Sequence, residues 1–145
     1  MTDVRRVVVV GIDGSDHSLM ALRRGIADAA LRQADLHVLY VTDVTPAVFH
    51  LPDSSKVSTT DLATVEREKA WEQAQPFLDS SPAPTRRVEL DGNPADAIVD
   101  YCQQVDAELL ILGTRGRGKL ATTFLGSTSL RALERSHCDV LIVKR

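Results

Sequence analysis

The chain has 145 residues, the length of one domain, and 20 acidic against 17 basic residues give it a formal net charge of −3. This charge disfavours nucleic acid and membrane surfaces as partners, so we expect any phosphate binding to be local. The longest apolar runs, Val7–Val10 and Leu109–Leu112, fall far short of the roughly 20 residues that cross a bilayer, and the first residues lack a signal-peptide core. We expect a single cytoplasmic domain over residues 1–145.

The first segments alternate between strand and helix. The apolar run from Val7 to Ile12 is typical of a strand covered on both faces, and the turn and capping residues Asp13-Gly14-Ser15-Asp16 follow it. Apolar residues at helical spacing then predict a helix of about 16 residues. Leu36 to Val41 is the second predicted strand.

The middle of the chain is less regular. Thr42 to Thr60 is rich in Pro, Ser, Thr and Asp, and two interpretations stay open: a mobile loop over a site, or a plain surface connection. A second amphipathic helix is predicted from Leu62 to Leu78, and the prolines of the segment Ser80 to Pro84 end it. Arg86 to Leu90 alternates polar and apolar residues, as an edge strand does.

The last elements continue the alternation. They are a helix opened by Gly92-Asn93-Pro94, a strand from Glu108 to Leu112, a helix from Ser127 to Ser136 and a strand from Val140 to Val143. Five strands separated by four helices predict an α/β fold, a five-stranded parallel sheet with helices on both faces. Ligands of such sheets bind at the carboxyl ends of the strands, where Asp13 and Gly113 lie.

A glycine pattern joins the fourth strand to the fourth helix: Gly113-Thr114-Arg115-Gly116, nine further residues, then Gly126-Ser127. Glycines let the backbone approach an anion, and the helix that begins at Ser127 offers free N–H groups and a favourable dipole. Arg115, Arg117 and Lys119 either neutralise a triphosphate or form an ordinary solvated loop face. The pattern predicts a phosphate cradle.

Two better-known signatures overlap this loop, and both fail. Gly113 to Lys119 matches a P-loop up to Leu120, where Ser or Thr must hold magnesium. Gly116 to Ala121 matches the dinucleotide fingerprint, but the next strand ends in Lys144-Arg145 and not in the acidic residue that the ribose needs. We therefore discount both a P-loop NTPase and a nicotinamide or flavin enzyme.

The wider pattern resembles a known family. With Val10 to Ser15 near the start, Gly92-x-Pro94 before the third helix and Cys138 to Val143 at the end, nearly the whole chain is similar to single-domain universal stress proteins of the type that binds ATP. The resemblance implies an open, doubly wound Rossmann-like sandwich, similar to the adenine nucleotide alpha hydrolases. Asp139 stands where many members have a proline.

The resemblance also implies residue roles. Asp13 would accept from the ribose hydroxyls, Val41 would line the adenine pocket, and the residues from Gly126 to Ser129 would hold the phosphates. The implied cofactor is ATP, with Mg²⁺ held through its phosphates and no protein metal site. The cofactor-binding candidates are Gly11, Asp13, Val41, Gly113, Arg115, Gly116, Arg117, Gly118, Gly126, Ser127, Thr128 and Ser129.

Structural alternatives remain for several residues. Asp13 can simply end a strand or cap a helix, and Ser127 can simply be an N-cap. Asp13, Ser15 and His17 have the residue types of a hydrolytic triad, but they crowd one helix start without a nucleophile elbow, so we assign no catalytic residue.

Cysteine and tryptophan are expected to be structural. Cys102 and Cys138 lack C-x-x-C spacing, so we expect buried hydrophobes and assign them no chemistry. Trp71 is expected to pack in the core and not to stack on a nucleobase.

The expected function is regulatory: an ATP-binding protein in stress response or dormancy, whose nucleotide state alters its dimer or its partner contacts. The apolar strand from Val140 to Val143 predicts a homodimer, because pairing across a two-fold axis would remove an exposed edge. Two alternatives stay open: an adenylyl or phosphoryl transferase or slow ATPase on the same fold, and an interaction module whose site is empty or holds AMP or a cyclic nucleotide.

Overall fold

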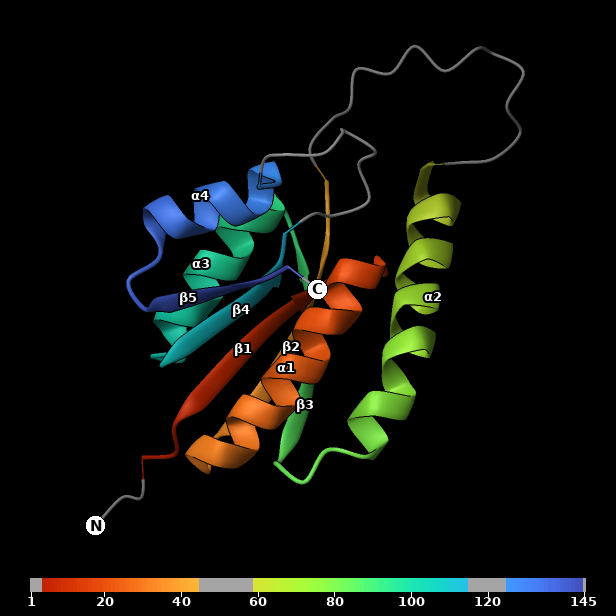
Figure 1. Ribbon diagram of the computed structural model, residues 1–145. Coiled ribbons are helices and arrows are strands. Elements are labelled where there is room, and N and C mark those ends of the chain that lie inside the picture. Colours follow the sequence, from red (N-terminus) through yellow and green to blue (C-terminus); the bar gives the residue numbers. More distant parts are fainter. Residues whose placement is uncertain (1–3, 45–58, 115–124, 145) are drawn as a thin grey trace, which may run out of the picture.

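The computed structural model describes residues 4–44, 59–114 and 125–144 (Figure 1). Strands and helices alternate through these residues as the sequence predicts. In chain order they are β1 (Val7–Ile12), α1 (Asp16–Arg32), β2 (Asp35–Thr42), α2 (Thr59–Asp79), β3 (Thr85–Asp91), α3 (Pro94–Gln104), β4 (Leu109–Gly113), α4 (Ser127–Arg135) and β5 (Asp139–Val143). None of the helices described is long and apolar enough to cross a membrane.

The five strands form one parallel sheet in the order β3-β2-β1-β4-β5. This confirms the predicted α/β fold and the edge position of β3. The chain moves outward from β1 to β3 and then returns to place β4 on the free side of β1. The winding direction therefore reverses between β1 and β4, which is where ligands bind in such sheets.

Two helices cover each face of the sheet (Figure 1). Val8, Val10 and Ile12 of β1 pack with α1 and α2, in what we call the α1/α2 cluster. Val9, between them, packs with α3 and α4 in the α3/α4 cluster. The alternation explains why β1 is apolar along its whole length, because neighbouring side chains enter different cores.

A glycine sets the distance between α1 and the sheet. A Cβ added at Gly25 would lie 2.2 Å from Cγ2 of Val10, so only glycine lets the helix approach β1 this closely. The helix is therefore held against the centre of the sheet, and its amino end is fixed at the carboxyl end of β1.

The helix boundaries differ slightly from those predicted. Most of the segment Thr42 to Thr60 lies outside the described residues, but α2 already begins at Thr59. Its Pro76 lies inside the last turns, where the missing N–H costs one helical bond on an exposed side. The last helix ends at Arg135, one residue earlier than expected.

Candidate functional site

The turn after β1 brings polar groups to the reversal point of the sheet. Oδ1 of Asp13 accepts a hydrogen bond from the backbone N–H of Ser15 at 2.9 Å, and Gly14 takes the left-handed conformation at φ +85° that this turn requires. Ser15, not Asp13, is the N-cap of α1, since its hydroxyl accepts from the N–H of Ser18. Asp13 is half-buried, and its second carboxylate oxygen has its own lone pairs, so the turn does not prevent it from binding a ligand.

The end of β4 rests directly on α1. A Cβ at Gly113 would lie 2.7 Å from the backbone carbonyl atoms of His17, so glycine is required for this contact. Next to it, Oγ1 of Thr114 is 3.1 Å from Nδ1 of His17. The glycine at the strand end therefore serves close packing of β4 on the first turn of α1.

Hydrogen bonds fix the start of α4 at the same place. The backbone N–H of Gly126 donates to the carbonyl of Thr114 at 2.8 Å, so residues 114 and 126 meet. The buried hydroxyl of Ser129 donates to the carbonyl of Gly113 at 2.7 Å. These two bonds place the amino end of α4 at the carboxyl end of β4.

The amino end of α4 has the features of an anion site. Gly126 is its N-cap and supplies no side-chain cap, and no acidic residue lies in the first turn. Ser127 is exposed, Thr128 is half-buried and Ser129 is buried. First-turn N–H groups without an internal acceptor, together with the helix dipole, favour a bound anion.

The remaining predicted site residues lie in the sheet or outside the described residues. Val41 lies near the end of β2, beside β1, and contacts the α3/α4 cluster. Gly11 is buried, and a Cβ there would meet the side chains of Leu112 and Ile98, so its small size serves core packing. Arg115, Gly116, Arg117, Gly118 and Lys119 lie outside the described residues.

His17 and Thr114 are the residues at this point that sequence analysis missed. Thr114 belongs to the glycine pattern, and His17 was weighed only as part of a triad. In the structure Nδ1 of His17 lies 3.1 Å from Oγ1 of Thr114, and Oδ1 of Asp13 accepts from the backbone N–H of Ser15. Spacing within α1 cannot reveal a contact with β4, because that contact depends on the sheet order.

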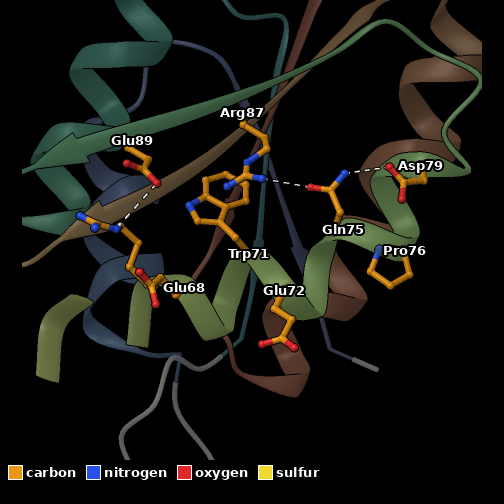
Figure 2. Close-up of a pocket in the computed structure, with 9 residues that line it drawn as sticks. Glu68, Trp71, Glu72, Gln75, Pro76, Asp79, Arg87 and Glu89 are labelled. Atoms are coloured by element: carbon orange, nitrogen blue, oxygen red, sulfur yellow. Dashed lines mark hydrogen bonds and ion pairs between the residues drawn. The ribbon is translucent and has the colours of Figure 1, made fainter. Parts of the chain in front are cut away.

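A separate groove of about 620 Å³ runs between α2 and the edge strand β3 (Figure 2). Its floor is Trp71, which is buried as predicted, and the guanidinium of Arg87 lies 4.2 Å from the centre of the indole ring. Arg87 also donates to Gln75 at 3.1 Å, and Gln75 donates to Asp79 at 2.8 Å. Because the groove follows the flank of β3, it is distinct from the reversal point of the sheet.

Comparison with known proteins gives a consistent result. A model of the universal stress protein family matches residues 5–144. Universal stress protein MJ0531 of Methanocaldococcus jannaschii is 31% identical over 138 residues, which cover 95% of this chain and 81% of that protein.

Solved structures share the fold. Universal stress protein UspA from Lactobacillus plantarum has a TM-score of 0.77 at 25% identity and covers 96% of this chain and 97% of its own. A universal stress protein in complex with cAMP has a TM-score of 0.72 at 28% identity, with 97% of each chain covered.

Proposed function

The chain belongs to the universal stress protein family, and from this premise we propose that it binds ATP at the carboxyl ends of β1 and β4. The observation that carries the proposal is the amino end of α4, which has no side-chain cap and is held at the end of β4 by the bonds of Gly126 and Ser129. The related protein solved with cAMP supports an adenine nucleotide as the ligand.

Each residue has a proposed role. Asp13 accepts from the ribose hydroxyls, Val41 lines the adenine pocket, and Ser127 and Thr128 offer amides and hydroxyls to the phosphates. Ser129 contributes its amide, because its hydroxyl is already donated to a backbone carbonyl. The proposed site also includes Gly11, Gly113, Arg115, Gly116, Arg117, Gly118 and Gly126.

The proposal places Mg²⁺ on the phosphates of ATP. In the part of the chain that the structure describes, no group of three or more His, Cys, Asp or Glu side chains is arranged to hold a metal. Mg²⁺ commonly keeps several waters and binds phosphate oxygens, so a dedicated protein site is not required. When bound, the ion would neutralise phosphate charge.

We further propose a regulatory role in the cytoplasm, in stress response or dormancy, with a homodimer formed through β5. Binding, and not rapid turnover, is the proposed activity. The contacts shown for His17 and Asp13 hold the end of β4 and a turn. A nucleotide that orders the start of α4 would also act near β5, because Thr114 accepts from Gly126 and donates its N–H to the carbonyl of Val143.

The test begins with the nucleotide itself. Freshly purified protein is denatured, any released nucleotide is identified by mass spectrometry, and ATP, AMP and cAMP are titrated by calorimetry with and without Mg²⁺. Phosphate release is followed in the same samples. Copurified ATP or ADP, or saturable ATP binding, is the expected result, whereas an empty protein that ignores ATP would favour the interaction module.

A matched pair of variants tests the site. Asp13→Asn is expected to weaken ATP binding about 10- to 100-fold, because a hydrogen bond to a charged group is worth about 1.5–3 kcal/mol. Asp100→Asn makes the same change on an exposed position of α3 and should bind as the wild type does. Equal affinities for the two variants would remove Asp13 from the site.

A further inference from the structure

The two cysteines, to which the sequence assigns no chemistry, come together on one face of the sheet. Cys102 lies on α3 and is fully buried, while Cys138 lies between α4 and β5 and is partly exposed. Both side chains belong to the α3/α4 cluster. Neither cysteine lies in the proposed nucleotide site.

Contacts around the cysteines fix their segments against each other. The carbonyl of Cys102 accepts from the N–H of Ala107 at 2.9 Å, which turns the chain from α3 into β4. In the sheet, Leu109 of β4 is paired with Asp139, the residue after Cys138. Next to these, Nε2 of His137 lies 3.9 Å from Oδ1 of Asp106 in the turn after α3.

The thiols themselves are neighbours. Cys138 packs against the same cluster in which Cys102 is fully buried. Burial, followed by the proximity of Cys138, raises the pKa of the Cys102 thiol to about 12. The sulfur of Cys138 also lies 3.2 Å from Oγ of Ser136. One thiol is thus shielded and protonated, and its neighbour is reachable from solvent.

We propose that Cys102 and Cys138 form an oxidation site that hydrogen peroxide converts into an intramolecular disulfide. Cys138 reacts first, because it is the more exposed thiol. Its thiolate sulfur attacks one peroxide oxygen, the O–O bond breaks, and the departing hydroxide takes a proton to become water. Cys138 is then a sulfenic acid.

The buried thiol completes the reaction. The sulfur of Cys102 attacks the sulfenic sulfur, the S–S bond forms, and the S–O bond breaks. The hydroxide that leaves takes the proton of the Cys102 thiol, giving a second water. In total two thiols lose two electrons and two protons, and one peroxide is reduced to two waters.

The bridge would enclose the part of the chain that carries the phosphate cradle. The loop from Cys102 to Cys138 contains β4, the glycine pattern and α4. Closing it removes freedom from the unfolded chain, so the oxidised protein is expected to melt several degrees higher than the reduced protein. The proposal does not depend on whether the protein binds ATP.

The experiment uses the full chain, first reduced and freed of reductant, then treated with a small excess of hydrogen peroxide. Non-reducing peptide mapping is expected to find Cys102 joined to Cys138. Both cysteines should stop reacting with a thiol reagent, and dithiothreitol should restore that reactivity. The reversible rise in melting temperature should follow the same time course.

Single variants provide the controls. In Cys102→Ser, peroxide is expected to drive Cys138 to sulfinic acid, because no resolving thiol is present. In Cys138→Ser, Cys102 should stay reduced, because it is buried. The proposal is overturned if the wild type yields only sulfinic acid on Cys138, a disulfide between two chains, or two thiols that stay reduced.

Discussion

At the scale of single residues, the turn formed by Asp13 leaves room for its proposed role in binding. One carboxylate oxygen of Asp13 accepts a hydrogen bond from the N–H of Ser15. The hydroxyl of Ser18 donates to the carbonyl of Ser15 and accepts from the N–H of Asp13. The sequence suggested Asp13 as a possible helix cap, but Ser15 takes that position. The turn therefore fixes the direction of the Asp13 carboxylate before any ligand arrives.

His37 on β2 is expected to titrate below its ordinary pKa. Its Nδ1 lies 2.8 Å from the hydroxyl of Tyr101. Burial first, and then the charge of Arg86, lower the pKa of His37 from 6.5, while Asp35 opposes the shift. Burial raises the pKa of Tyr101, so at neutral pH its O–H can donate to a neutral imidazole. A proton NMR titration should give His37 a pKa below 6.5.

The same shift predicts the direction of a stability change. Because the unfolded chain binds the proton more tightly than the folded one, lowering the pH below about 6.5 should reduce the free energy of unfolding, until His37 is protonated in both states. Urea unfolding of the wild type and of His37→Gln at several pH values isolates this contribution. A variant that loses as much stability as the wild type over that range would contradict it.

At the scale of elements, one buried hydroxyl helps to hold the start of α4 against the end of β4. Ser129→Ala leaves the carbonyl of Gly113 without its donor, and we expect a loss of about 1–3 kcal/mol in the free energy of unfolding. ATP affinity should fall as well, because one of the two bonds that hold the amino end of α4 is lost. Urea denaturation and calorimetry measure the two effects.

Ser127→Ala is the matched control on the same helix. Ser127 is exposed, so removal of its hydroxyl should change the free energy of unfolding by less than about 0.5 kcal/mol. The same change should still weaken phosphate binding. If Ser129→Ala is as stable as Ser127→Ala, the bond to Gly113 does not anchor the helix.

Periodicity predicted the elements well because each helix has one apolar side and each central strand has two. Val7 to Ile12 and the stripe of α3 that contains Ile98 and Val99 are examples. The bond from Ser129 to Gly113 was not predictable, because spacing within α4 says nothing about which strand end lies opposite. Likewise, sequence separation hid the contact between Cys102 and Cys138.

At the scale of the whole molecule, the strand order decides which predicted residues can act together. Alternation of strands and helices predicts a parallel sheet, yet it does not say that β4 returns to the free side of β1. That return is what brings Gly113 and Thr114 onto the first turn of α1. Local motifs were thus enough to propose Asp13 and Gly113 as site residues, whereas the place where the ends of β1 and β4 meet required the fold.

The two edge strands of the sheet differ in charge and polarity, and this difference predicts where a second copy of the chain would bind. The β3 edge carries the exposed charged residues Arg86, Arg87 and Glu89, which discourage pairing, whereas Val140 to Val143 of β5 are half-buried and apolar. Hydrogen exchange measured at low and high protein concentration should therefore show added protection in β5 and none in β3. Light scattering at the same concentrations reports the mass. If the protein stays monomeric and the protection of β5 does not change with concentration, the edge of β5 remains open. The proposed dimer would then have to be abandoned.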